Sequence, residues 1–387
     1  MRHRSPRWAP LPGVLLAILV ALLARPSWAI DRTFSGSAQF DYLFDPSEPN
    51  GSARQIGFDG FTAEVALKLS ADLTNHASVN VKVCFGCHGF EDDMAYLDYR
   101  VMDELNFRVG RFSPSFGGFN LRHDPGNHGT SDKPLPYDMG RMLRYPEWNL
   151  GVLPAPFPNN GLEIDGTHAF GKSATLDYAL YAVTGFKASE GEFDLDFVQS
   201  RSLYYVGNGS LPTVGGRLSV TKRFAPRVEA TLGASGMGGT FDPNNLYTYV
   251  IVGTDLSVRV KQTSIRAEYL ARRQDLATTD PTQLKYTLAQ AGTSFVKHGA
   301  YVEVERPINR VVTMIGRADG LFRIGNAGID SDLQRSNWMG RLTYATTFAV
   351  ERGVKVKAST EFWQFSDADA AGRGRDVVFH LGVVGLF

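Results

Sequence analysis

The stretch DVVFHLGVVGLF, residues 376–387, decides the fold and ends the chain. Its alternate residues fall on one face: Val377, Phe379, Leu381, Val383, Gly385 and Phe387. Successive side chains of a β-strand point to opposite faces, so this period of two is typical of a strand with one apolar face. The segment therefore predicts an amphipathic last strand that finishes on the aromatic ring of Phe387.

The same period recurs upstream of this segment. In 61–70, 94–101, 265–272 and 354–362, apolar residues alternate with polar or charged ones. A soluble β-sandwich also alternates in this way, so alternation alone does not choose between a sandwich and a barrel. Many of these segments run to about ten residues, whereas strands of soluble proteins average about five or six. Their length favours a barrel.

The connections between the expected strands alternate in length. We expect sixteen strands, at 33–43, 58–70, 76–83, 92–101, 104–111, 161–170, 174–184, 213–222, 227–235, 246–260, 263–273, 293–305, 310–323, 335–348, 352–365 and 376–387. The odd connections are the long ones, among them 44–57, 112–160, 185–212, 274–292 and 366–375. The even ones are tight turns such as Lys261-Gln262. An even strand count with short turns at one end and long loops at the other is typical of bacterial transmembrane barrels.

Composition excludes several function classes. The 387 residues carry 40 Lys+Arg and 40 Asp+Glu, so no excess of positive charge points to nucleic acid. Aromatic residues make up 12% of the chain. No run of about 18 apolar residues follows the N-terminal segment, which argues against a membrane-spanning helix.

Residues 1–29 read as a secretory signal peptide. Arginines precede an apolar run at 14–23, which is too short to span a bilayer. Ser27 and Ala29 place small residues at the −3 and −1 positions of a cleavage site before Ile30. An uncleaved anchor is the alternative. We expect export through the inner membrane.

The terminal strand ending on Phe387, the even strand count and the alternating connections together resemble the outer-membrane porins of Gram-negative bacteria. Within that family the chain is most similar to the sixteen-strand general and phosphate-selective type. The resemblance covers essentially all of 30–387. It implies an all-β, transmembrane antiparallel barrel in the cell outer membrane, among lipid and lipopolysaccharide. It also implies recognition of the last strand by the barrel-assembly machinery, a homotrimer, and a water-filled channel for passive diffusion of small solutes.

A barrel of this size leaves an aqueous lumen, and its inward side chains decide what passes. The polar face of the expected strands carries both signs of charge. The expected lining residues are Glu64, Lys68, Asp98, Arg100, Arg108, Glu163, Asp165, Arg217, Arg266, Glu268, Glu303, Arg317, Asp319, Lys355, Lys357 and Glu361. Opposed acids and bases would set up a field across the pore.

The connection 112–160 follows the fifth expected strand, where the resemblance places a loop that folds inward and narrows the pore. Its eight prolines forbid further strand. So long a structureless loop suits a compact domain only because a lumen gives it room. Its expected constriction residues are Arg111, Arg122, Asp124, Asp132, Lys133, Asp138, Arg141, Arg144 and Glu147. Acids offset the arginines, so we predict weak ion selectivity.

The only two cysteines lie in the segment Cys84-Phe85-Gly86-Cys87-His88, which matches the c-type haem attachment signal C-x-x-C-H. His88 would then be the proximal iron ligand, and His123, His128, Met139 and Met142 are candidate distal ligands. The oxidising conditions met by an exported protein favour a disulfide between Cys84 and Cys87 over haem. A further alternative is another metal, although zinc prefers four ligands and only three are local.

Three other functions stay open at this point. A haem-bearing barrel would transfer electrons, and a purely structural barrel would conduct nothing. An outer-membrane enzyme requires a nucleophile beside a positioned histidine. The sequence contains no G-x-S-x-G elbow or comparable signature, so we do not expect an enzyme.

Overall fold

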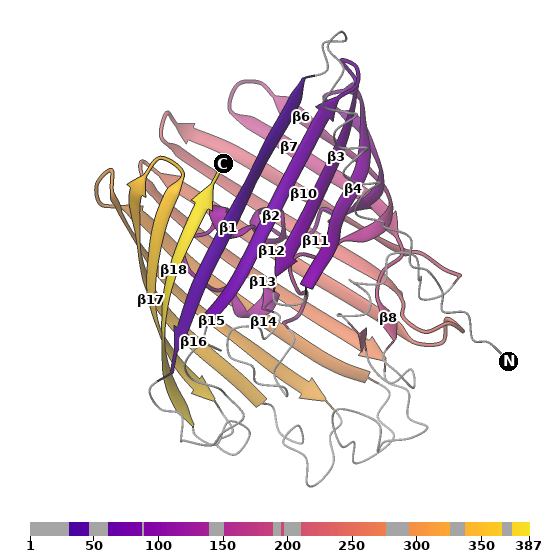
Figure 1. Cartoon of the computed structure of the whole chain (residues 1–387). Helices are drawn as coiled ribbons and strands as arrows, with labels where there is room; N and C mark the ends of the chain where they lie inside the picture. The colour runs from indigo at the N-terminus through magenta and orange to yellow at the C-terminus, as the bar shows by residue number, and fades with distance from the viewer. Residues whose placement is uncertain are drawn as a thin grey trace, which may run out of the picture.

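The computed structural model describes residues 31–45, 61–86, 89–138, 151–188, 195–196, 210–275, 294–325, 337–365 and 374–387. Sixteen antiparallel strands close into one barrel, as the sequence predicts (Figure 1). They are β1 (Arg32–Phe44), β2 (Phe61–Asp72), β3 (Ala77–Gly86), β4 (Gly89–Met102), β5 (Leu105–Phe112), β6 (Asn159–Phe170), β7 (Ala174–Val183), β10 (Thr213–Ala225), β11 (Val228–Thr240), β12 (Thr248–Val260), β13 (Thr263–Asp275), β14 (Ser294–Pro307), β15 (Val312–Gly325), β16 (Asn337–Glu351), β17 (Val354–Phe365) and β18 (Arg375–Leu386). Two short strands, β8 (Lys187–Ala188) and β9 (Leu195–Asp196), pair outside the barrel. The expected signal peptide lies outside the described residues.

The first and last strands close the barrel. β1 pairs with β2 on one side and with β18 on the other, and Phe40 lies opposite Val383. The Gly36 amide donates to the Phe387 carbonyl at 2.9 Å, and the Phe387 ring lies 5.7 Å from that of Phe34. Closure leaves no unpaired edge, which a sheet surrounded by lipid requires.

Short turns gather at one end of the barrel, where the C-terminus also lies (Figure 1). We refer to this end as the short-turn end. The connection between β3 and β4 departs from the expected pattern, because both strands continue past the predicted boundaries until Gly86 pairs with Gly89. The period of two runs on through Cys84 and Phe85, which explains why the strand does not end at 83.

The two faces of the wall differ as the alternation predicts. On β18, Phe379, Leu381 and Val383 are exposed on the outer surface, whereas His380 and Val384 are buried on the inner side. Large apolar side chains are exposed in the same way on strand after strand around the barrel. Such a continuous apolar outer band is what lipid-facing strands present. No helix among the described residues has the length and apolar character needed to cross a membrane.

The hydrophobic core lies inside the barrel, between the wall and the connection that follows β5. Its members from that connection are Phe116, Phe119, Leu135, Tyr137, Val152, Leu153, Ala155 and Phe157. Its members from the wall include Tyr181, Met237, Tyr249, Ile251, Leu270, Tyr301, Leu321, Met339, Trp363 and Val378. The lumen wall of β7 and β11–β18 is therefore partly apolar, and the connection packs on it.

Candidate pore constriction

The described parts of the connection between β5 and β6, 113–138 and 151–158, run through the lumen. We call them the inner loop. Three short 3-10 turns shape it: η2 (Asn120–Arg122), η3 (Pro125–Asn127) and η4 (Leu135–Tyr137). η3 lies against β1 and β18, and η4 lies against β14 and β15. The loop thus crosses the lumen and contacts walls that are far apart in the sequence.

Glu268 of β13 fixes the first part of the inner loop. Its carboxylate accepts hydrogen bonds from the amides of Gly118 (2.9 Å) and Phe119 (3.1 Å) and from the Tyr301 hydroxyl (3.2 Å). The Tyr137 hydroxyl donates a fourth bond to it. The sequence predicted that Glu268 faces the lumen, and the side chain does face inward, but it is buried against the loop.

Two arginines of the wall bind the inner loop through Asp132. Arg317 Nη2 lies 2.7 Å from Asp132 Oδ1, and Arg341 forms an ion pair with the same carboxylate. Asp319 sits between the arginines: Arg341 Nε donates to its Oδ1 at 2.9 Å, and Arg317 Nε lies 3.1 Å from its Oδ2. These four side chains have no solvent exposure. Each charge in such a buried cluster needs its partner, because removal of one leaves the other buried and uncompensated.

Lys357 of β17 is a third buried anchor. Its ammonium donates to the carbonyls of Pro125 (2.7 Å) and Thr130 (3.1 Å) and to Gln39 Oε1 (3.0 Å). The Thr130 carbonyl also accepts from His128 Nδ1 at 2.9 Å. Burial lowers the pKa of His128, and the nearby Lys357 cation lowers it further, so this imidazole stays uncharged at neutral pH.

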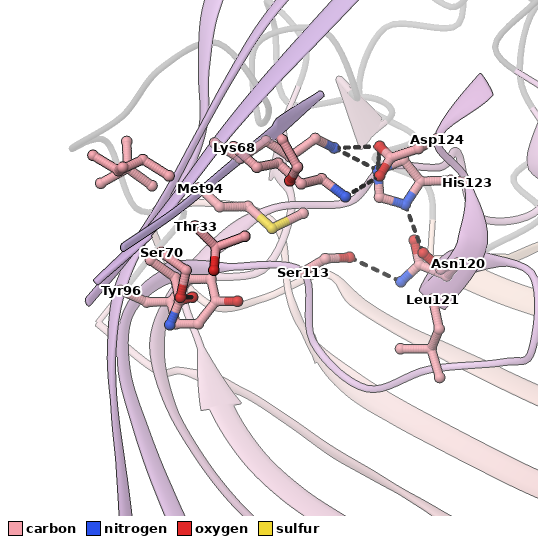
Figure 2. A pocket seen from close by; sticks show the side chains of 15 residues that line it. Thr33, Lys68, Ser70, Met94, Tyr96, Ser113, Asn120, Leu121, His123 and Asp124 are labelled. Carbon is pink, nitrogen blue, oxygen red and sulfur yellow. Dashed lines mark hydrogen bonds and ion pairs between the residues drawn. The ribbon is translucent and has the colours of Figure 1, made fainter. Parts of the chain in front are cut away.

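A cavity of about 310 Å³ separates η2 from the wall of β1–β4 (Figure 2). Lys68 and Lys82 reach from β2 and β3 toward the inner loop and both contact Asp124, with Lys82 Nζ 2.8 Å from Asp124 Oδ1. Lys82 also donates to His123 Nε2 at 2.9 Å, while His123 Nδ1 donates to the Asn120 carbonyl at 2.6 Å. We call this group the lysine cavity.

The two lysines differ in exposure. The Lys68 side chain is 44% exposed and the Lys82 side chain only 5%. Burial alone would raise the pKa of Asp124, but the adjacent His123, Lys82 and Lys68 hold it well below the usual range for a carboxyl. Asp124 therefore stays charged, and the cavity keeps one positive charge in excess, exposed at Lys68.

A second cavity, of about 510 Å³, lies on the other side of Leu121, which lines both. Acids outnumber bases in it: Asp165, Asp177 and Asp255 against Arg108 and Arg217. Both bases are held by acids. Arg217 Nη2 donates to Asp255 Oδ1 at 2.8 Å, and Arg108 Nη1 lies 2.9 Å from Glu163 Oε1. The lumen thus has a basic side and an acidic side, separated by the exposed Leu121 side chain.

The structure places the sequence-predicted residues in several different surroundings. Asp132, Arg317, Asp319, Glu268, Glu303, Lys357 and Glu361 are buried between the loop and the wall. Lys68 and Asp124 line the lysine cavity, and Arg108 lines the acidic side. Arg100 instead lies at the short-turn end, paired with Asp103. Arg141, Arg144 and Glu147 lie outside the described residues.

The remaining predicted residues take local roles. Glu64 faces inward on β2 and is half-buried, and Arg111 is buried where the inner loop begins. Lys133 Nζ donates to the Ala155 carbonyl at 2.7 Å, which joins the two described parts of the loop. Arg122 Nη2 lies 3.5 Å from Glu303 Oε1. The Asp138 amide donates to the Leu135 carbonyl at 3.2 Å and closes η4.

Sequence reasoning missed two central residues, Lys82 and Arg341. Each follows the alternation of its own strand: Lys82 shares a face with Asn80, and Arg341 shares a face with Thr343. The inward phase of β3 and β16 would have identified both. Their contacts with the inner loop had no sequence signal, because the partners are far apart in the chain.

The cysteine motif is only partly described. Cys84 lies on β3, half-buried on the inward face that carries Lys82, opposite Ala66 and Glu91. Cys87 and His88 lie outside the described residues, as do the candidate ligands Met139 and Met142. The other two candidate ligands already make hydrogen bonds within the inner loop, His123 to Asn120 and His128 to Thr130. In the described residues no three His, Cys, Asp or Glu side chains are grouped to hold a metal ion.

Comparison with known proteins first gives a partial sequence match. No protein-family model matches the chain. An uncharacterized protein of Aquifex aeolicus (strain VF5) is 30% identical over 150 residues. The match covers 38% of this chain and 30% of that protein, so the chain spans less than a third of the relative's length. This match assigns no family.

The fold has solved counterparts. The anion-selective porin from Comamonas acidovorans superposes with a TM-score of 0.58 and 13% identity, over 92% of this chain and 100% of that one. Salmonella typhi OmpF, in complex with daunomycin, superposes with a TM-score of 0.58 and 10% identity, over 92% of this chain and 97% of that one. The outer membrane channel DcaP of Acinetobacter baumannii superposes with a TM-score of 0.54 and 13% identity, over 92% of this chain and 97% of that one. The chain therefore has the closed sixteen-strand barrel fold of the outer-membrane porins.

Proposed function

We propose that this protein is an outer-membrane porin that lets small hydrophilic solutes or ions diffuse through a narrowed, water-filled lumen. The observation that carries the proposal is a closed sixteen-strand barrel with an apolar outer face and a charged inner face that borders open cavities. Barrels of this size are too wide for wall side chains alone to fill. A barrel with a purely structural role would not need exposed charged side chains on both sides of its lumen, so these charges favour a channel.

The inner loop is the constriction in this proposal. It is anchored by Glu268, Asp132 and Lys357 contacts and leaves separate basic and acidic cavities beside it. A fixed loop of this kind limits the size of solutes that pass. Since the two cavities carry opposite excess charge, we expect a small preference between anions and cations and no strict selectivity. Whether the chain belongs to the phosphate-selective subtype depends on that measurement.

The surroundings follow from the same proposal. Residues 1–29 direct export and are removed, the long loops face outside, and the short-turn end faces the periplasm. The last strand, ending at Phe387, serves as the signal for the barrel-assembly machinery. The outer band contacts lipid and lipopolysaccharide, and three copies associate. Cross-linking in mild detergent tests the trimer.

Conductance of the refolded barrel tests the function directly. In planar bilayers we expect discrete, ohmic single-channel steps in KCl, and proteoliposomes should swell in small sugars but not in large ones. Protein denatured before reconstitution is the control. Bilayers that stay silent and vesicles that admit no solute would contradict a porin and favour a structural barrel.

The motif at Cys84, Cys87 and His88 forms a separate part of the proposal, with two outcomes. Periplasmic expression followed by intact mass and a pyridine haemochrome spectrum distinguishes them. A covalent haem adds the mass of the porphyrin and a Soret band, and would move the function toward electron transfer. A disulfide removes two hydrogens and gives no band. A Cys84→Ser/Cys87→Ser variant is the control for both signals.

A further inference from the structure

The short-turn end of the barrel has two halves of unequal charge. Along β10–β17 its four turns and the adjoining strand ends comprise 222–229, 259–261, 305–310 and 351–355, with nine Lys and Arg against three Asp and Glu. Along β1–β7 the corresponding segments comprise 31–32, 72–76, 100–104 and 172–177, with three bases against five acids. We call the first half the basic rim.

Most bases of the basic rim point to solvent without a partner in the described residues. Arg227, Lys261, Arg306, Arg310 and Arg352 are exposed, and none forms an ion pair within the described part of the chain. Arg310 lines a cavity beside His128 of the inner loop and so borders the lumen, whereas Arg306 shares the outward face of β14 with Val302 and Val304. Arg100, on the opposite half, is paired with Asp103. The excess charge of the basic rim is therefore available to a ligand.

Exposed apolar side chains alternate with these bases. Phe224, Ile308, Val311 and Val350 lie in the segments of the basic rim or directly next to them, and each is more than half exposed. Phe224 follows Arg223 directly, and Val311 follows Arg310. Apolar anchors beside long basic side chains are typical of a membrane–water interface, where the stem lies along apolar surface and the charged head reaches the phosphates.

The shape of the basic rim favours lipid over a protein partner. The four turns follow one another along an arc at this end of the barrel (Figure 1), and the bases lie in these turns or at the adjoining strand ends. A ring of lipid headgroups around a barrel follows the same arc, whereas a globular partner would contact one compact patch. Basic side chains at a membrane surface attract anionic lipids, each by about 1 kcal/mol, or roughly fivefold in affinity.

We propose that the basic rim binds the headgroup phosphates of anionic phospholipids in the leaflet that adjoins the short-turn end. The barrel then has one side, β10–β17, that gathers anionic lipid and an opposite side that does not. The inference rests on the membrane placement proposed above but not on solute passage.

Native mass spectrometry of the refolded full-length mature chain tests the inference. The protein is held in mixed micelles with equal amounts of phosphatidylglycerol and phosphatidylcholine, and bound lipids are counted. We expect the wild type to retain more phosphatidylglycerol. Arg306→Gln/Arg352→Gln should reduce that preference several-fold, and high salt should reduce it too. Arg32→Gln/Lys172→Gln, which removes two exposed bases from the opposite half, is the matched control and should leave the preference unchanged.

Several outcomes would overturn the inference. Equal retention of the two lipids by the wild type excludes it, as does an equal loss in the test and control variants. Displacement of the bound lipid by millimolar inorganic phosphate would mean a general anion surface and also excludes it. Single-channel conductance is measured on the same samples: silent channels with intact lipid preference contradict the porin proposal alone, and normal channels without lipid preference contradict the basic rim alone.

Discussion

The inner loop meets the barrel wall in two very different ways. Against β13–β17 it is held by charges with no exposure and by apolar packing, as at Asp132, Arg317 and Arg341. Against β2 and β3 it is held by Asp124 and His123, beside a cavity where Lys68 stays 44% exposed. A lumen-facing charge therefore has two roles, and exposure separates them. Buried charges anchor the loop, and exposed charges face the solute.

The largest expected effect comes from the anchoring wall. Asp132→Asn leaves Arg317 and Arg341 short of a buried partner, which should lower the free energy of unfolding by about 3–5 kcal/mol. Denaturant unfolding in detergent measures it. Asp103→Asn, at an exposed pair on the short-turn end, is the control and should change stability by less than about 1 kcal/mol. If Asp132→Asn and Asp103→Asn were equally stable, the buried charges could not be said to anchor the inner loop.

Loss of the Glu268 anchor should have a smaller effect. Glu268→Gln keeps the side-chain shape but replaces one acceptor oxygen with a donor, so the amides and hydroxyls that bind Glu268 lose part of their pairing. We expect destabilisation of about 1–3 kcal/mol and a larger, noisier single-channel conductance as the loop loosens. Ser257→Ala, on the inward face of β12 beside the acidic cavity, is a comparison that removes none of the Glu268 hydrogen bonds. Quiet, wild-type conductance in Glu268→Gln would contradict the anchoring role.

A substitution in the lysine cavity should change the ion selectivity of the channel more than the stability of the barrel. Lys68→Gln removes the exposed excess charge, so anion permeability relative to cation permeability should fall, by up to about fivefold for a loss of about 1 kcal/mol. The free energy of unfolding should change by less than about 1 kcal/mol, since an exposed pair contributes little. Reversal potentials in a KCl gradient measure the ratio. Lys172→Gln, in the turn between β6 and β7 at the short-turn end, is the charge-matched control. A shift of the same size there would refute a local role for Lys68.

The smallest expected effect is that of acid on Asp124. Its pKa lies below the usual value, so its ionised form is stabilised in the folded barrel, and that contribution is lost only as pH falls through the lowered pKa. The contribution of Asp124 to ion selectivity should therefore stay constant from pH 7 to about pH 4, where a free Asp side chain would be about half protonated. A selectivity change within that window that disappears in Asp124→Asn would show that the lysines do not hold the carboxylate as described.

The sequence alone determined the barrel. The even strand count and the final strand from Val377 to Phe387 indicate a closed barrel. The period of two determines which residues face outward, because a one-residue slip would turn every side chain to the wrong face. For the same reason the inward position of Lys68, Glu268 and Arg317 was predictable. Strand ends were less so, as the extension of β3 and β4 to Gly86 and Gly89 shows.

Only the tertiary structure decided which inward charges meet the inner loop. Asp132 and Arg341 are more than two hundred residues apart, and Lys82 and Asp124 come from a strand and a loop with unrelated periodicities. Proline and charge content predicted that 112–160 is irregular, but irregular backbone has no period from which a contact can be read. Those contacts are set by the curvature of the closed wall, which brings β2, β13 and β17 around one short segment of chain.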